Sequence, residues 1–170
     1  DALLHGYREA VLRRGRTPDY VVILMCNVMT ITSRYVDEAI EALEADPSAD
    51  SAVTVTQFNM YSPLRARSLG EDGYLRPFVP FEVFGDPATL NCDRGSQGDV
   101  YVANMSHSVS RARALEDMDS GLLPQKWMGQ RILPVHQDFG CDLDASWQIA
   151  ASVAWVEDNG FGPDTTPYDD

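Results

Sequence analysis

The segment that decides the fold is Ile132–Trp147, which reads ILPVHQDFGCDLDASW. Its first four residues form an apolar run, and this run predicts a short strand. Gly140 ends the strand pattern, Asp142 and Asp144 follow it, and a helical pattern then begins. Alternate side chains of an extended segment lie on the same face, and open α/β sheets bind ligands at their strand ends. We therefore expect both carboxylates to face one point at the end of this strand.

The two aspartates have two interpretations. Two like charges that lie close together repel each other, and a bound cation relieves that repulsion. Mg2+ suits such a pair, because proteins usually hold it with one or two carboxylates together with the phosphates of a substrate. The structural alternative is that Asp144 caps the following helix and Asp142 closes a turn. The first interpretation predicts a metal site, and the second predicts none.

The residues before this segment alternate between helical and strand patterns. Apolar side chains recur at helical spacing over residues 1–15, and the run YVVILMC at 20–26 suits a strand that is buried on both faces. A second helix is expected from Ser33 to Ala45, and residues 52–58 alternate as in a strand. This order is typical of right-handed crossover connections. It predicts a Rossmann-like, three-layer α/β domain with a mostly parallel sheet.

The regular pattern fails between residues 61 and 97, where prolines and glycines are frequent. This segment is too apolar for a free linker, so we expect it to pack against a second subunit or against its own domain. Its large apolar residues include Leu75, Phe78, Val79, Phe81, Val83 and Phe84. We therefore predict one domain over residues 1–162, with 61–97 as a protruding dimerisation segment and 163–170 as a flexible tail.

Three further elements are expected after the protruding segment. Residues 99–104 have the composition of a short strand, and Ser106 can cap a helix from His107 to about Met118. The last helix, residues 145–159, has apolar side chains on all sides. A helix of that kind is expected to be largely buried.

Composition excludes several classes of function. The net charge is −13, from 26 acidic and 13 basic residues, which argues against a nucleic-acid-binding surface. The three cysteines and three histidines show no disulfide or zinc spacing. No glycine-rich phosphate loop or nucleophile elbow is present. The sequence shows no apolar run long enough for a membrane span and no signal-peptide pattern, which indicates a cytoplasmic protein.

Several strings in order resemble the cytidylyltransferase family, whose members include the CMP-sialic acid and CMP-Kdo synthetases. Residues 20–40 look like the family's buried strand, substrate loop and following helix, and residues 50–56 like its next strand. Residues 97–102, QGDVYV, are similar to its asparagine–glycine turn and short strand. Residues 140–144, GCDLD, are similar to its metal-binding D-x-D element, and residues 155–161 to its closing helix end.

The resemblance implies a dimeric enzyme in which the hydroxyl of an acidic sugar attacks the α-phosphate of CTP and pyrophosphate leaves. Mg2+ would lie on Asp142 and Asp144, where it would neutralise charge on the phosphate oxygens. The protruding segment would reach the active site of the partner subunit. Among the residues of the sugar site, Arg94 suits a sugar carboxylate. The sugar site would be lined by Asn27, Arg94, Gln97 and Gly98.

The sequence departs from the family pattern in two places. The family's CTP-binding element, an N-terminal strand followed by a loop rich in arginine, glycine and lysine, has no counterpart in these residues. Met25–Val28 also replaces the usual glutamine–proline–threonine–serine substrate loop, so the sugar specificity is expected to differ. The resemblance thus predicts either the C-terminal part of a longer enzyme or a catalytically inactive, dimeric interaction module.

Overall fold

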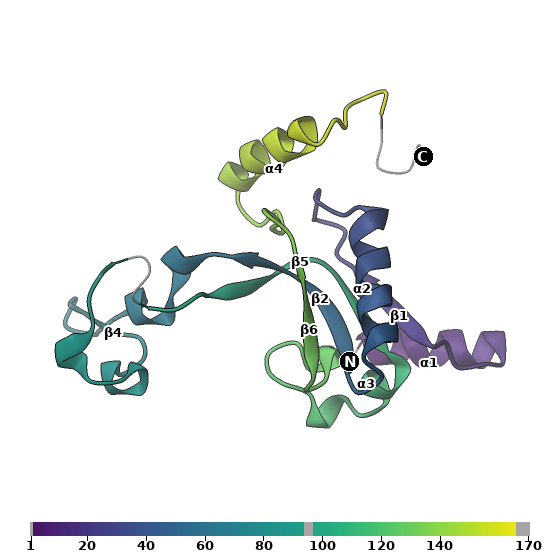
Figure 1. Cartoon of the computed structure of the whole chain (residues 1–170), viewed down its shortest axis with the longest axis horizontal. Helices are drawn as coiled ribbons and strands as arrows, with labels where there is room; N and C mark the ends of the chain where they lie inside the picture. The colour runs from purple at the N-terminus through teal and green to yellow at the C-terminus, as the bar shows by residue number, and fades with distance from the viewer. Residues whose placement is uncertain (1, 94–96, 166–170) are drawn as a thin grey trace. The chain divides into compact units, whose positions relative to one another are not determined.

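The computed structural model of the chain describes residues 2–93 and 97–165. The chain divides into two compact units, and β2 and β5 carry residues of both. The first unit comprises Asp1–Val55 with Ala103–Asp170, and the second comprises Thr56–Val102. The helices are α1 (Ala2–Arg14), α2 (Ser33–Ala45), α3 (Ala112–Glu116) and α4 (Ser146–Asp158) (Figure 1). The strands are β1 (Tyr20–Leu24), β2 (Ser51–Gln57), β3 (Arg67–Leu69), β4 (Leu75–Pro77), β5 (Tyr101–Arg111) and β6 (Ile132–His136).

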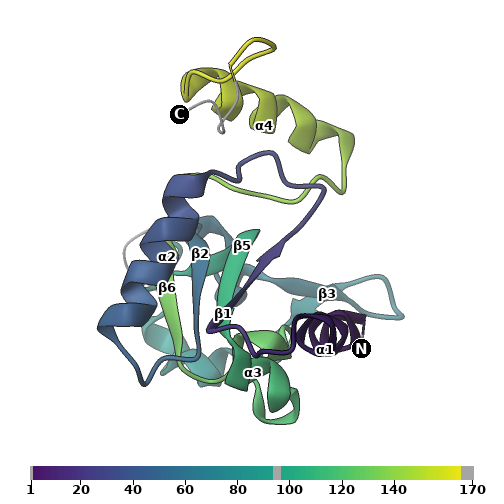
Figure 2. The ribbon, with the colours of Figure 1, turned by 90° about the vertical axis from the view of Figure 1, so that its right-hand side faces the viewer.

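The main sheet has four strands in the order β1-β5-β2-β6 (Figure 2). β1 pairs antiparallel with β5, and β2 pairs parallel with β6. Backbone hydrogen bonds from Arg111 N to Asp50 O and from Phe58 N to Val100 O join β5 and β2 in the antiparallel sense. Consequently β1, β2 and β6 all run in one direction, and β5 runs against them.

The protein is α/β as predicted, but the prediction of a mostly parallel sheet is wrong. Two of the three neighbouring strand pairs are antiparallel, because β5 lies between β1 and β2. The helix predicted from His107 is also wrong, since β5 continues to Arg111 and only the short α3 follows. The residues of 106–110 alternate between serine and a larger side chain, a period of two that is typical of a strand.

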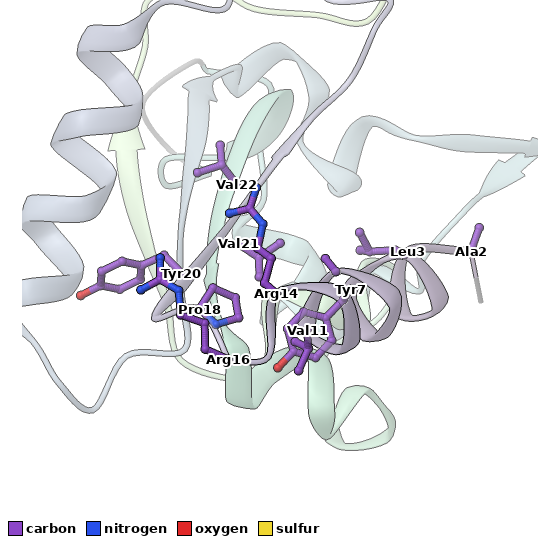
Figure 3. A pocket seen from close by; sticks show the side chains of 12 residues that line it. Ala2, Leu3, Tyr7, Val11, Arg14, Arg16, Pro18, Tyr20, Val21 and Val22 are labelled. Atoms are coloured by element: carbon purple, nitrogen blue, oxygen red, sulfur yellow. The ribbon is translucent and has the colours of Figure 1, made fainter.

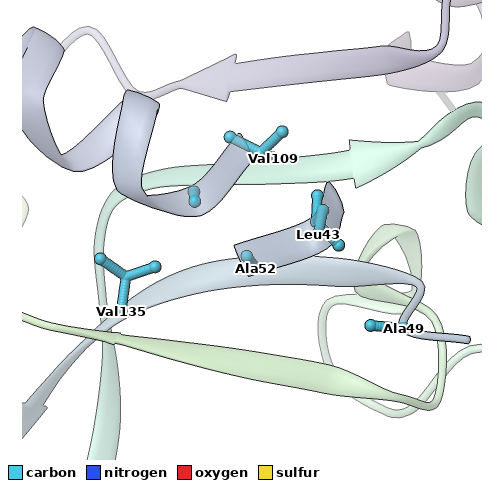
Figure 4. Packing of buried hydrophobic residues seen from close by; sticks show 6 residues of the cluster. Leu43, Ala49, Ala52, Val109 and Val135 are labelled. Carbon is cyan, nitrogen blue, oxygen red and sulfur yellow. The ribbon is translucent and has the colours of Figure 1, made fainter. Parts of the chain in front are cut away.

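Two apolar clusters stabilise the first unit. In the first cluster, α2 packs on the sheet through Leu43 and contacts Val109 and Val135 (Figure 4). The second cluster joins α1 to α3 around Tyr7 and Leu115. The neighbouring strand residues Tyr20 and Val21 belong to the first and the second cluster respectively. Neighbouring side chains of a strand point to opposite faces, so helices cover both faces of the sheet.

Two apolar elements are more exposed than the sequence predicts. β1 was expected to be buried on both faces, but it lies at the edge of the sheet, and Val22 and Leu24 are 40% and 52% exposed. Helix α4 was expected to be largely buried, but Ser152 is its sole buried residue, and Trp147 is 69% exposed. Within residues 2–93 and 97–165, no helix combines the length and the apolar character needed to cross a membrane.

His107 gives the first unit a pH-dependent stability. Its side chain lies on β5 and is almost fully buried. This burial lowers the pKa of the imidazole, and the Tyr35 backbone and the Glu38 carboxylate offset the shift only in part. The unfolded chain therefore takes up the proton at a higher pH than the folded chain, so acidification through about pH 6.5 destabilises the fold.

Urea unfolding at pH 7.5 and pH 5.5 tests this prediction. We expect the wild type to lose more stability over this range than a His107→Leu variant, by up to about 1.4 kcal/mol. The carboxylates titrate in both proteins, so their contribution cancels in the comparison. An equal loss of stability in the two proteins would contradict the assignment to His107.

Candidate functional site

The structure brings together the loops that follow β1 and β6, the two outer strands of the main sheet. β1 and β6 run in the same direction, so their carboxyl ends lie at one edge of the sheet. Asn27 follows β1, and its backbone oxygen accepts a hydrogen bond from Leu143 N at 2.9 Å. Val28 and Asp142 form an antiparallel bridge next to that bond. The segment with the two aspartates thus lies directly against the loop that begins at Asn27.

Neither aspartate is used to cap helix α4. The helix begins at Ser146 with Ala145 as its N-cap residue. The backbone N–H groups of Asp144 and Ala145 both donate to Oε1 of Gln148, which reaches back from the first turn. The interpretation of Asp144 as a helix cap is therefore wrong. Gln148, which sequence reasoning did not single out, holds this end of the helix.

The carboxylates of Asp142 and Asp144 are available for a ligand. Among the residues that the structure describes, neither carboxylate forms a hydrogen bond or an ion pair. Asp142 is half-buried and Asp144 is exposed. These two carboxylates, and the amide oxygen of Asn27 in the loop after β1, can supply oxygen ligands. This chemistry fits a hard cation such as Mg2+.

At this site the described residues of the first unit provide two acidic side chains and no larger group of metal-binding side chains. No group of three or more histidine, cysteine, aspartate or glutamate side chains suited to a metal occurs in the described ranges 2–93 and 97–165. Mg2+ typically retains water and binds through one or two carboxylates plus phosphate oxygens. A pair of carboxylates is therefore suited to a cation that arrives with a phosphorylated ligand, and less suited to a permanently bound metal.

The second unit contains a pocket with a positive charge. Its volume is about 330 Å³, and Gln97 lies in its wall together with Arg65 and Arg67. Gln97 Oε1 accepts a hydrogen bond from Arg65 Nε at 3.2 Å, and Gln97 Nε2 donates to Asn91 O at 2.8 Å. Gly98, the next predicted residue, adopts a left-handed φ of 72° in the turn after Gln97 and does not line the pocket. Arg94 lies outside the described residues.

Sequence reasoning missed Arg65 and Arg67. A second Arg65 nitrogen donates to Cys92 O at 2.8 Å, and the Arg67 guanidinium lies 5.3 Å from the centre of the Phe81 ring. Neither arginine forms an ion pair within the described part of the chain, and no acidic side chain lines the pocket. In a chain with net charge −13, such a pocket favours a carboxylate or a phosphate. The spacing of two arginines in PLRAR was the available sequence signal.

A larger cavity of about 510 Å³ lies between α1 and β1 (Figure 3). Tyr7 and Val11 of the helix and Val21 of the strand form its apolar wall, and none of the predicted site residues lines it. The Tyr7 hydroxyl donates to Glu116 at 2.7 Å. Burial, aided by Glu116, raises the pKa of Tyr7 to about 12, so the phenol stays protonated at neutral pH. The tyrosine is therefore a packing residue and not a base.

The chain matches no protein-family model and no curated protein sequence. The fold and the candidate site together define the class of this protein. It is an α/β protein whose first unit carries, after a strand of a mixed sheet, two carboxylates that have no hydrogen-bond or ion-pair partner among the described residues. Its second unit holds a pocket with two arginines that form no ion pair within the described part of the chain.

Proposed function

We propose that this chain acts in nucleotidyl transfer, as a cytidylyltransferase that activates an acidic sugar with CMP from CTP. The observation that carries the proposal is the pair of carboxylates of Asp142 and Asp144, which have no partner among the described residues and whose backbone segment bonds to the Asn27 loop. In the reaction the sugar hydroxyl oxygen bonds to the α-phosphorus, the bond from that phosphorus to the pyrophosphate oxygen breaks, and the hydroxyl proton is released. Pyrophosphate is the second product.

The residues of the first unit have distinct roles in this proposal. Asp142 and Asp144 would hold Mg2+, which supplies positive charge to the phosphate oxygens when it is bound. The side chain of Asn27 forms no hydrogen bond within the described residues, so its amide is available to a ligand. An amide can both donate to a phosphate or sugar oxygen and accept from a hydroxyl. Asn27 would therefore orient the bound ligand without taking part in proton transfer.

The second unit, which contains the protruding segment 61–97, would bind the acidic part of the sugar at the active site of a partner subunit. A guanidinium and a carboxylate form strong, charge-assisted hydrogen bonds. Arg65 is suited to this role, because its hydrogen bonds to Gln97 and to the Cys92 carbonyl fix its orientation in the pocket. Arg65 forms no ion pair in the described ranges. The carboxylate of the sugar would therefore not have to displace an acidic side chain from it.

A thermal-shift panel with nucleotides and Mg2+, on the protein in its full-length form, tests the proposed function. A ligand that binds only the folded state raises the unfolding temperature by mass action. We expect CTP with Mg2+ to raise it, and CTP with EDTA or Mg2+ alone to raise it less. Pyrophosphate release from CTP with Kdo or sialic acid is the matching activity assay. The proposal fails if CTP does not stabilise the protein in a Mg2+-dependent way.

Replacing Arg65 with alanine is expected to weaken the binding of the acidic sugar by about tenfold to a hundredfold, the usual effect of losing a hydrogen bond to a charged group. Titration calorimetry with the free sugar measures this change. Arg76→Ala is the matched control, because Arg76 is an exposed arginine of the same unit that pairs with Asp72 and does not line the pocket. Equal weakening in both variants would contradict a specific role for Arg65.

The surface of the second unit favours a second candidate function, a dimeric interaction module without catalytic activity. Five of its large apolar side chains are 68–73% exposed. Two of them, Leu69 and Leu75, are paired across the β3–β4 hairpin. Exposed apolar patches of this kind mark interaction sites. The five residues are Leu69, Tyr74, Leu75, Phe78 and Val83.

Analytical ultracentrifugation tests whether this surface joins two copies of the chain. We expect the wild type to form a dimer and the double variant Leu75→Glu/Phe78→Glu to remain a monomer, because carboxylates cannot be buried unpaired in an apolar interface. Leu12→Glu is the control, since Leu12 is an equally exposed leucine of α1 in the other unit. A dimer that binds no nucleotide would favour the interaction module over the enzyme.

A further inference from the structure

A closed ring of hydrogen bonds lies beneath the two site loops of the first unit. The Thr30 and Ser106 hydroxyls are 2.7 Å apart, and Ser106 N donates to Asn104 Oδ1 at 3.1 Å. Asn104 Nδ2 donates to Gln137 Oε1 at 2.9 Å, and Gln137 Nε2 donates to Thr30 O at 2.8 Å. The four residues thus connect the loop after β1, strand β5 and the residue after β6.

The ring is shielded from water, and its bonds are therefore costly to break. All four residues are at most 4% exposed. When a buried donor or acceptor loses its partner, the free energy rises by the full desolvation penalty of that group. A buried network in which every polar group has a partner therefore favours one arrangement of the chain. Gln137 N also donates to Val55 O at 2.9 Å, which fixes the ring to the parallel pair of β2 and β6.

The ring contacts the loop of the aspartates through Gly140. A β-carbon at this position would lie 2.7 Å from Asn104 Nδ2 and 2.8 Å from Ser106 Oγ, closer than side chains approach each other. Only glycine therefore lets the backbone lie directly on the ring. Two residues later Asp142 forms its bridge with Val28, and Leu143 N donates to Asn27 O.

The backbone of β5 is strained at the ring. Met105 has a left-handed φ of 63°, which is uncommon for a residue other than glycine. It lies between Asn104 and Ser106, and the hydrogen bond from Ser106 N to Asn104 Oδ1 spans it. Strained residues persist where their surroundings over-determine them, and they cluster at functional sites.

From this geometry we infer that Asn104 and Gln137 are positioning residues for the ligand site. Their amide pair holds the Asn27 loop and the Gly140–Asp144 loop in one arrangement, so that the two free carboxylates face a ligand without rearrangement. Mutation of groups that orient metal ligands typically weakens metal affinity by about tenfold to a hundredfold. The role in ligand binding depends on the proposed function, but the role in holding the two loops does not.

Native-state amide exchange of Gln137→Met tests the positioning role. Methionine has a similar length and lacks the amide, so Asn104 Nδ2 and Thr30 O each lose a partner. We expect the Leu143 amide, which bonds Asn27 O, to exchange about tenfold faster relative to the Val109 amide of the core strand. The exchange rate of the Leu143 amide is divided by that of the Val109 amide to correct for a change in global stability.

Ser108→Ala is the matched control for this measurement. It removes a buried hydroxyl of the same strand that accepts from Trp127 Nε1 at 3.2 Å and is not a member of the ring. This variant is expected to leave the Leu143 to Val109 ratio unchanged. The inference is overturned if Gln137→Met and Ser108→Ala change the ratio equally. Asn104→Leu provides a second test of the ring should the methionine variant fail to fold.

Mn2+ titration followed by electron paramagnetic resonance separates this inference from the proposed function. If the wild type binds Mn2+, Gln137→Met is expected to weaken the affinity by about tenfold or more, and Ser108→Ala is expected to leave it unchanged. Unchanged Mn2+ affinity in Gln137→Met would overturn the positioning of the carboxylates. If the wild type does not bind Mn2+, the metal role in the proposed function fails, and the exchange ratio still decides whether the ring holds the loops.

Discussion

Replacing Leu43 with alanine is expected to lower the free energy of unfolding by about 3 kcal/mol, within the range measured for fully buried leucines. Leu43 is 0% exposed and belongs, with Val109 and Val135 of the sheet, to the apolar cluster under α2. Truncation removes apolar contacts and leaves a cavity that close-packed neighbours cannot fill. Urea denaturation followed by circular dichroism measures the loss.

Leu12→Ala is the control for this prediction. Leu12 lies on α1 and is 75% exposed, although its helical spacing places it in the predicted apolar stripe of residues 1–15. Substitution of an exposed residue of this kind is expected to change stability by less than about 0.5 kcal/mol. A similar loss in both variants would show that α2 does not form the core of the first unit.

Local periodicity was enough to predict most of the elements that build this core. Helix α2 and strands β2 and β6 lie within a residue or two of their predicted positions, because apolar spacing and flanking turn residues define them locally. Only the first part of β5 was predicted, as the strand over residues 99–104, because the alternation that continues to Arg111 runs directly into the helical spacing of Ala112 and Leu115. That error also hid the antiparallel direction of the strand, and with it the order of the sheet.

Exposure was harder to predict than secondary structure. The apolar runs of β1 and α4 indicate elements that bury their side chains, yet Leu24 and Trp147 are among the exposed large apolar residues. Composition shows that a surface is apolar, but not which other element covers it. Burial depends on contacts between distant parts of a chain, and a local pattern contains no such information.

Strand direction predicts which end of the sheet the segments of the candidate site leave, but not that they meet, because β5 and β2 separate β1 from β6. Asn27 and Asp142 follow parallel strands of one sheet, and the structure places their backbones side by side. The arginine pocket was not predictable, because Arg65, Arg67 and Gln97 meet through irregular backbone. The ring of Asn104 and Gln137 was also hidden, since its members are ordinary polar residues far apart in sequence.

Replacing Asp142 or Asp144 with asparagine is expected to reduce Mg2+-dependent pyrophosphate release by at least about a hundredfold. Asparagine keeps the shape of the side chain but removes the negative charge that a hard cation requires. Each variant loses one of two anionic ligands, and several kcal/mol of charge stabilisation depend on the bound metal. The rate with CTP and an acidic sugar, measured at saturating Mg2+, gives the effect. Asp138→Asn is the control, because Asp138 is an exposed acid of the same loop.

The stability of the same variants distinguishes a ligand role from a structural one. The two carboxylates make no hydrogen bond or ion pair in the described residues, so their loss removes no contact that supports the fold. Their replacement should therefore change the stability of the metal-free chain by less than about 0.5 kcal/mol. A turn or cap residue would behave differently, since its loss costs about 0.5–2 kcal/mol. Activity and stability that fall together would therefore assign these aspartates to the fold, whereas a loss of activity alone assigns them to the ligand.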